Sequence, residues 1–344
     1  MRNRWIRTAL SAAALMLAVL PANAVMAEDA AGVYPSELTN EYISASLMEQ
    51  RPVAVMVDNE SIALPHYGTA KADVVYEIMN STANQRVSRL MVLVKDWQSI
   101  TQLGSIRSTR TTNIPLAAEW NAVLVHDGGP FYVDSFFAKP YAAQHFSGGF
   151  TRVDNGKAYE FTEYVTAADL QARFDSTMFP RNYNEFRNED TTHFNFAGQE
   201  ERIVLSGSYP GEAMAASEIS VPFYHNGSTL RYNDATGTYD YYEYGELHQD
   251  AEDGAVMTFT NLLLQCCSFE ELDENGYMDY NTVDSGKPGY YVTGGEAVPV
   301  TWTKESETDI TRFYDASGAE LTINTGKTYI ALVPEDTWSE VQIG

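Results

Sequence analysis

The sequence predicts an α+β protein in which a layered mixed-sheet α/β first domain precedes a smaller β-rich second domain. Two observations support this fold class. The first half alternates continuous apolar runs with helical segments, whereas the second half alternates strand-like segments with turn signals. The composition agrees, because 44% hydrophobic and only 20% charged residues are typical of a globular protein. At roughly 100–200 residues per domain, a chain of 344 residues accommodates two domains.

Continuous apolar runs mark the strands expected in the first domain. They occupy residues 53–57, 74–76, 90–94 and 122–125. Runs of this kind predict strands that are buried on both faces of a sheet. A helix is expected over residues 113–120 between two of them. Thr166 and Asp169 have the spacing of a capping box, which predicts a second helix that ends near Asp175.

Turn signals mark the second domain, which we place at residues 211–344, after a first domain at residues 51–210. The turn pairs are Asn226-Gly227, Thr236-Gly237, Asp253-Gly254, Asn275-Gly276, Ser317-Gly318 and Thr325-Gly326. Residues 298–303 alternate apolar and polar side chains with period two, as a half-solvated strand does. The four tyrosines between residues 239 and 244 are expected to pack across strands rather than to form a ligand platform.

The first 27 residues have the features of a secretory signal peptide. Arg2, Arg4 and Arg7 form a basic region, residues 9–20 are apolar, and small residues at 22–27 offer a cleavage site. Twelve apolar residues are too few to cross a bilayer, which takes about 20. We therefore expect a secreted or cell-envelope protein with no transmembrane segment after cleavage. Residues 28–50 form a polar lead-in with a short helical stretch near 41–49.

Charge and cysteine content exclude several classes of partner. With 22 Lys+Arg and 47 Asp+Glu the net charge is 22 − 47 = −25, so nucleic acid and anionic membrane surfaces are not expected partners. Cys266 and Cys267 are the only cysteines, so no disulfide framework is possible. They are either small buried side chains or a vicinal or intermolecular disulfide. The six histidines form no metal-binding motif, and we predict no metal and no cofactor.

Polar residues lie at the ends of several predicted strands of the first domain. The candidate ligand-binding residues are Asp58, Asn59, Glu77, Arg89, Arg107, Ser108, Arg110, His126, Gly128 and Gly129. In open α/β sheets, ligands bind where loops converge beyond the carboxyl ends of strands, so these residues are expected to line one cleft. Arg107 and Arg110 would clamp an anion, all the more if a helix began at this point. The two glycines would let backbone N–H groups approach the ligand.

Three functions remain open for this constellation. The first is binding of an anionic small molecule or a cell-wall glycan. The second is hydrolysis of a wall glycan or phosphoester, with Asp58 or Glu77 as general base and His126 as its partner. The third is structural, with the charges paired as a buried ion network. No nucleophile elbow, P-loop or dinucleotide fingerprint is present, so the sequence leaves open whether the protein is an enzyme.

Several ordered motifs resemble one known family. In the first half they are RPVAVMVDN at 51–59, ADVVYE at 72–77, SR at 88–89, GSIRSTR at 104–110 and VHDGG at 125–129. In the second half they are TWTK at 301–304, YDASG at 314–318 and NTGKTY at 324–329. Together they resemble the YerB-like family, which is built on domain of unknown function 3048 and has no assigned activity. The resemblance implies a bacterial envelope or secreted protein with an α+β first domain and a smaller β-rich second one.

Two features of this sequence depart from the family pattern. Members are often lipoproteins, but no lipobox cysteine is present here, so the resemblance does not imply a lipid anchor. Members also tend to carry an Ala-Pro-His-Asn-like segment after the His-x-Gly-Gly loop. The comparable stretch here, residues 156–161, has no histidine. If that histidine serves catalysis in relatives, this chain is expected only to bind.

Overall fold

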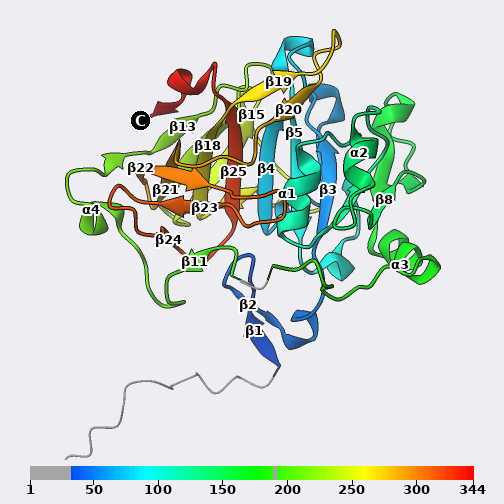
Figure 1. Cartoon of the computed structure of the whole chain (residues 1–344), viewed down its shortest axis with the longest axis horizontal. Helices are drawn as coiled ribbons and strands as arrows, with labels where there is room; N and C mark the ends of the chain where they lie inside the picture. Colours follow the sequence, from blue (N-terminus) through cyan, green and yellow to red (C-terminus); the bar gives the residue numbers. More distant parts are fainter. Residues whose placement is uncertain (1–31, 189–191) are drawn as a thin grey trace, which may run out of the picture.

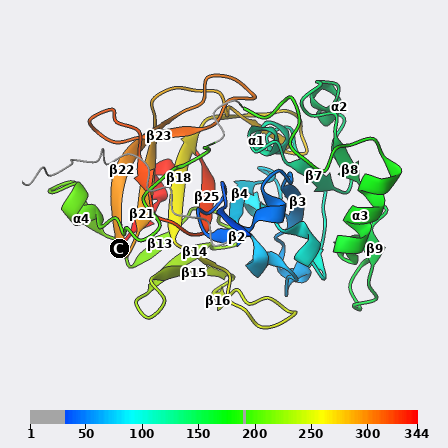
Figure 2. The ribbon, with the colours of Figure 1, turned by 90° about the horizontal axis from the view of Figure 1, so that it is seen from below.

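A large mixed sheet runs through the middle of the molecule, with helices on one face and a smaller antiparallel sheet on the other (Figures 1 and 2). The computed structural model describes residues 32–188 and 192–344, so the predicted signal peptide lies outside the described residues. This arrangement confirms the predicted fold class of a large layered sheet accompanied by a smaller β-rich unit. None of the helices in the described part of the chain is long and apolar enough to cross a bilayer.

The large sheet has eleven strands, and its order is β12-β22-β21-β18-β25-β4-β5-β3-β7-β8, with β23 paired to β22. The strands from the first half are β3 (Val53–Asp58), β4 (Val74–Met79), β5 (Ser88–Val94), β7 (Val123–His126) and β8 (His145–Ser147). Those from the second half are β12 (Met214–Ala215), β18 (Asn261–Cys267), β21 (Lys287–Thr293), β22 (Glu296–Thr303), β23 (Arg312–Tyr314) and β25 (Thr328–Pro334).

The core strands of this sheet are the continuous apolar runs of the sequence. Every residue of β3, β4, β5 and β7 is buried, as expected for strands covered on both faces. The sheet does not stop at the predicted boundary near residue 210. Strand β25, from the end of the chain, pairs in parallel with both β4 and β18 and so joins strands from the two halves. The two halves therefore share one continuous hydrogen-bonded sheet.

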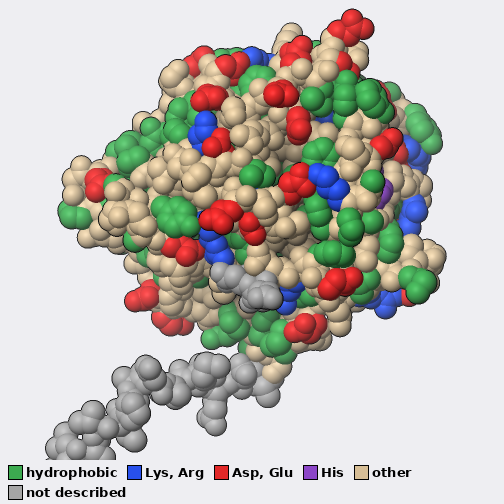
Figure 3. Space-filling view, viewed as in Figure 1, with side chains coloured by type: hydrophobic (Ala, Val, Ile, Leu, Met, Phe, Trp, Pro, Cys, Tyr) green, Lys and Arg blue, Asp and Glu red, His purple; other side chains and the backbone are tan. Residues whose placement is uncertain are grey.

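The helices are short. They are α1 (Asn113–Glu119), α2 (Val133–Phe137), α3 (Ala167–Ser176) and α4 (Leu205–Ser208). Helices α3 and α4 lie at opposite ends of the large sheet (Figure 2). Thr166 caps α3 through the predicted capping box with Asp169. Figure 2 shows α1 and α2 on one side of the sheet, and acidic side chains are spread over this side of the surface in Figure 3.

The opposite face is covered by the smaller antiparallel sheet, of order β16-β15-β14-β13-β26, with β17 paired to β15 (Figure 2). Its strands are β13 (Glu218–Ser220), β14 (Thr229–Asn233), β15 (Thr238–Glu243), β16 (Glu246–Leu247), β17 (Thr258–Phe259) and β26 (Gln342–Ile343). Tyr239 and Tyr241 of β15 are fully buried, in agreement with the packing role expected for this tyrosine-rich stretch.

Short strand pairs complete the fold. They are β1 (Val33–Pro35) with β2 (Tyr42–Ser44), β6 (Leu103–Gly104) and β9 (Thr151–Arg152) with β10 (Glu163–Val165), β11 (Asn195–Phe196) with β24 (Thr322–Ile323), and β19 (Phe269–Glu271) with β20 (Met278–Tyr280). The helical stretch expected near residues 41–49 is wrong in part, because β2 and a single 3₁₀ turn at Ala45–Leu47 occupy it. Cys266 and Cys267 are free and buried, so the disulfide alternatives do not apply.

Candidate functional site

Strand alternation divides the predicted site residues between the two faces of the large sheet. Asp58 of β3 pairs with Arg89 of β5, so these side chains point to one face. Glu77 pairs instead with Leu90, one residue further along β5, and points to the other face. Asn59 and Ser88 lie on the Glu77 side and contact its carboxylate. Asp58 and Asn59 are therefore neighbours in sequence whose side chains point to opposite faces of the large sheet.

On the helix-covered face, three arginines gather beside Asp58; we call Asp58, Arg89, Arg107 and Arg110 the arginine cluster. Arg107 Nε lies 2.6 Å from Asp58 Oδ2, and its Nη1 lies 3.3 Å from the exposed Glu160 carboxylate. Among the described residues, the two carboxylates that form ion pairs with these arginines are those of Asp58 and Glu160, and both contact Arg107.

Arg89 and Arg110 have only neutral partners among the described residues. Arg89 donates to the Ser108 carbonyl at 2.7 Å, and Arg110 donates to the Thr109 carbonyl at 2.9 Å and lies over the Tyr277 ring. Burial, opposed in part by Asp58, lowers the pKa of Arg89 to about 10. Burial together with repulsion from the other two arginines lowers the pKa of Arg110 to about 9. Both stay protonated near neutral pH, so the cluster holds uncompensated positive charge.

The Gly-Gly loop lies against the arginine-bearing segment. The Arg107 carbonyl accepts from Asp127 N–H, and Thr109 N–H donates to the Gly128 carbonyl. Gly128 has φ +74°, a conformation that side-chain-bearing residues rarely adopt, and a Cβ at Gly129 would approach Val133 to 3.0 Å. The segment before α1 is not helical, because α1 begins at Asn113. The shared helix face proposed for Arg107 and Arg110 is therefore not formed.

His126 is on the helix-covered side, but its imidazole belongs to a separate contact. Its Nδ1 donates to the Gly128 carbonyl at 2.7 Å, which leaves Nε2 to accept from His145 Nδ1 at 2.9 Å. The ring stacks on Phe137. Burial lowers the pKa of His126 to about 4, so this imidazole is neutral at physiological pH.

On the opposite face, Glu77 is the centre of a buried hydroxyl network. Its Oε1 accepts from Ser88 and Ser228 at 2.5 and 2.6 Å, and its Oε2 accepts from Tyr241 and Tyr329 at 3.0 and 2.7 Å. Burial raises the pKa of Glu77 to about 6, and these hydrogen bonds limit the rise. Tyr241 and Ser228 belong to the smaller-sheet layer, so the network joins the two sheets.

The ten predicted residues thus fall into three places. The structure brings together Asp58, Arg89, Arg107, Ser108, Arg110, Gly128 and Gly129 on the helix-covered face. Asn59 and Glu77 lie on the other face, and the His126 imidazole contacts His145. The candidate catalytic set of Asp58, Glu77 and His126 is consequently not assembled around one point.

Two hollows adjoin this region. A gap of about 10 Å³ beside Arg89 and Arg110 has room for about one water, so a larger anion would have to contact the cluster from its exposed edge. A hollow of about 580 Å³ lies near α1 and the β19–β20 hairpin. It is lined in part by Glu270, Asp279 and Glu307.

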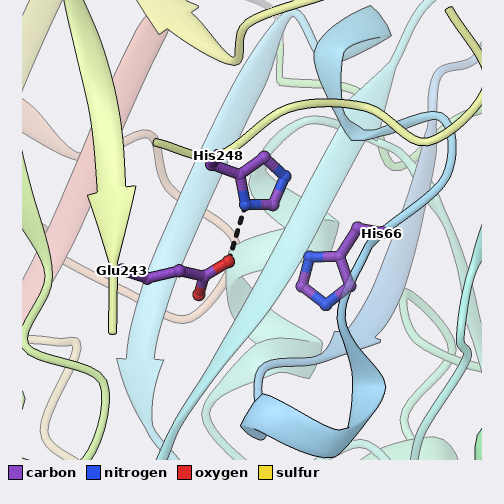
Figure 4. A group of neighbouring side chains, drawn as sticks. All are labelled: His66, Glu243 and His248. Carbon is purple, nitrogen blue, oxygen red and sulfur yellow. Dashed lines mark hydrogen bonds and ion pairs between the residues drawn. The ribbon is translucent and has the colours of Figure 1, made fainter. Parts of the chain in front are cut away.

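The sequence analysis did not find a second buried group of polar side chains, which lies where the smaller sheet packs against the large one. His66, Glu243 and His248 come together there (Figure 4). His66 and Glu243 are 177 positions apart in the sequence. The three residues match no short metal-binding motif, so no local pattern could have indicated the group.

Comparison with protein families identifies the chain. Residues 38–180 match the N-terminal domain of a protein of unknown function, DUF3048, and residues 219–330 match the C-terminal domain of the same family. The chain belongs to the DUF3048 family. The motifs at residues 51–59, 88–89 and 104–110, which carry the arginine cluster, fall within the first DUF3048 domain.

One relative and one solved structure show how far the similarity extends. The chain is 23% identical over 316 residues to a Bacillus subtilis (strain 168) protein named "Putative lipoprotein YerB", covering 89% of this chain and 88% of that protein. The crystal structure of YerB protein from Bacillus subtilis has the same fold, with a TM-score of 0.73 and 20% identity. That match covers 90% of this chain and 99% of the other. The family resemblance inferred from the motifs is therefore confirmed, and the DUF3048 fold extends over both halves of the chain.

Proposed function

We propose that this DUF3048 protein is an exported cell-envelope protein that binds an anionic ligand through the arginine cluster. The main support is that, of the three arginines, Arg107 alone forms ion pairs with carboxylates of the described residues. Within that part of the chain, Arg89 and Arg110 contact only backbone carbonyls and the Tyr277 ring. Guanidinium groups bind phosphate and carboxylate oxygens in pairs. An anion at this site would neutralise charge that the protein itself leaves unpaired.

Cell-envelope placement has two supports. The first 27 residues have the composition of a secretory signal, and the related Bacillus subtilis protein is named a putative lipoprotein. The prediction is that the mature chain begins near residue 28 and is recovered outside the cytoplasm. Fractionation followed by N-terminal mass spectrometry checks this. An intact Met1 in the cytoplasmic fraction would contradict it.

The binding experiment depends on choosing the right arginine. Arg107 forms an ion pair with the buried Asp58, so replacing Arg107 would leave a buried carboxylate unpaired and disturb the fold. Arg110 pairs with no carboxylate of the described residues, so it can be replaced without this cost. The matched control is Arg231→Gln. Arg231 also lies over a tyrosine ring, that of Tyr242, but it is on the smaller sheet and pairs with Glu218.

Titration calorimetry of the mature protein with inorganic phosphate at low salt measures the effect. We expect wild type and Arg231→Gln to bind equally and Arg110→Gln to bind about tenfold more weakly or worse, which is about 1.4 kcal/mol. A neutral N-acetylglucosamine oligomer serves as the second probe, and it tests recognition of a glycan rather than an anion. Equal phosphate affinity in all three folded proteins would contradict the proposal.

Two further variants, Asp58→Asn and Arg107→Ala, separate the two alternatives. Turnover of a phosphoester by wild type that disappears in Asp58→Asn would favour a hydrolase. Absence of phosphate binding together with a sharp loss of thermal stability in Arg107→Ala would favour a structural ion network, since breaking a buried pair costs about 3–5 kcal/mol.

A further inference from the structure

Two imidazoles and a carboxylate converge behind the smaller sheet, as Figure 4 shows. His66 lies in the loop between the 3₁₀ turns Ser61–Ala63 and Thr69–Lys71, in the first half of the chain. Glu243 ends β15, and His248 directly follows β16. One ligand atom from each side chain lies within 4.8 Å of the other two. The group is therefore compact enough for all three side chains to reach one small ion.

Polar atoms in this group have no hydrogen-bond partner, although the side chains are almost fully buried. His66 is 0% exposed, and neither ring nitrogen has a partner in hydrogen-bond geometry among the described residues, although the Asp58 backbone lies near the ring. Glu243 Oε2 has no such partner either, although the Asn59 side chain lies near its carboxylate. In Figure 4, one ring nitrogen of His66 faces Glu243 and His248. Buried polar side chains are normally satisfied, and a converging set that is not satisfied indicates a ligand that occupies the gap between them.

His248 is already oriented as a metal-binding histidine would be. Its Nε2 lies 2.8 Å from Thr69 Oγ1, and its Nδ1 points at Glu243 Oε1 from 2.6 Å. Histidines that bind metals usually have the second ring nitrogen held by another protein group, which fixes the ring and its tautomer. Thr69 supplies that contact here. With Nε2 protonated toward Thr69, the Nδ1 lone pair faces Glu243 Oε1, and at 2.6 Å these two atoms share a proton that a bound metal ion would displace.

The carboxyl groups of this region have no basic partner. Neither Glu243 nor the neighbouring buried Glu77 has a Lys or Arg partner in the described part of the chain. A buried carboxylate is expensive to ionise unless it is paired or coordinates a metal.

We infer that His66, Glu243 and His248 bind a divalent transition-metal ion of the zinc class. Two imidazole nitrogens and one carboxylate suit zinc and its first-row neighbours, whereas calcium and magnesium prefer all-oxygen sites. This inference departs from the expectation that the chain holds no metal. It is independent of the anion site, which lies on the other face of the large sheet.

The ion would cross-link two parts of the fold. It would connect the loop that carries His66, in the first half, to the end of β15 and the segment after β16 in the smaller sheet. Its expected effect is on stability, because the three ligands are buried and exposed to little or no solvent. A metal that binds the folded state alone raises the melting temperature as its concentration exceeds the Kd.

The test uses the mature full-length protein, unfolded in guanidinium with EDTA and refolded with or without one equivalent of zinc. After gel filtration, zinc per chain and Tm are measured. The ligand variants are His66→Gln and Glu243→Gln. The control is His225→Gln, because His225 lies in the same layer beside Tyr244 but outside the group. Arg110→Gln is added to separate this site from the anion site.

We expect wild type, His225→Gln and Arg110→Gln to retain about one zinc per chain and to gain roughly 5 °C in Tm. His66→Gln and Glu243→Gln should bind zinc at least tenfold more weakly and gain no Tm. If His66→Gln does not refold, the near-isosteric Glu243→Gln decides. Wild type that retains no zinc, or ligand variants that bind it as wild type does, would overturn the inference.

Discussion

The two faces of the large sheet treat charge in opposite ways. On the helix-covered face, Arg89 and Arg110 are cations without carboxylate partners among the described residues; Arg89 is buried and Arg110 is half-buried. On the face covered by the smaller sheet, Glu77 and Glu243 are buried carboxyl groups, and no Lys or Arg of residues 32–188 or 192–344 pairs with them. One sheet can therefore hold a cationic site on one face and an anionic site on the other, because successive strand residues point to opposite faces.

The largest expected effect concerns Glu77, which is satisfied by four hydroxyl groups rather than by a cation. Glu77→Ala removes the acceptor for all four and leaves them buried, so we expect the free energy of unfolding to fall by about 3 kcal/mol or more. Glu77→Gln, which keeps the size and one acceptor, should lose clearly less. Urea denaturation at pH 7 measures both. An equal loss in the two variants would mean that the hydroxyl network contributes little.

A smaller effect follows from the raised pKa of Glu77. Its folded pKa of about 6 lies above the ordinary 4.5, so the native state holds the proton more tightly than the unfolded chain does. The stability linked to this proton is fully present below pH 4.5 and is lost as pH rises through about 6. Relative to Glu77→Gln, wild type should gain about 2 kcal/mol as pH falls through this window in EDTA. Urea titrations at several pH values check the difference, and a flat difference would contradict it.

The smallest effect on stability is expected on the helix-covered face. Burial and repulsion from Arg89 and Arg107 lower the pKa of Arg110, so the fold disfavours its charge. Removing this charge at pH 7 therefore takes no stability away. Arg110→Gln should unfold within about 0.5 kcal/mol of wild type, or slightly above it, although it loses phosphate affinity. A clear destabilisation would show that Arg110 is a structural residue.

The strands and the capped helix could be predicted because their signals are local. The apolar runs at residues 53–57 and 90–94 became β3 and β5, and Thr166 with Asp169 capped α3 as expected. The pairing of β25 with β4 could not be predicted. It joins residues that are about 250 positions apart, and no local pattern specifies which strands become neighbours.

The candidate site was predicted in part for the same reason. The residues of the arginine cluster lie close together because the segment around Arg107 runs beside the ends of β3 and β7. The grouping of Asp58 with Glu77 overlooked strand alternation, which was readable from the registers of the apolar runs only once their pairing was known. The group of His66, Glu243 and His248 depends on the packing of the smaller sheet against the large one. That packing has no signature in the sequence around any of the three.

Anomalous diffraction from crystals of the mature protein, refolded with zinc and then soaked in tungstate, a tetrahedral oxyanion like phosphate, tests the division between the two faces most directly. We expect a zinc peak among His66, Glu243 and His248, and a tungstate peak beside Arg110 on the opposite face of the large sheet. Both peaks on one face, or tungstate bound elsewhere while the arginine cluster stays bare, would contradict it.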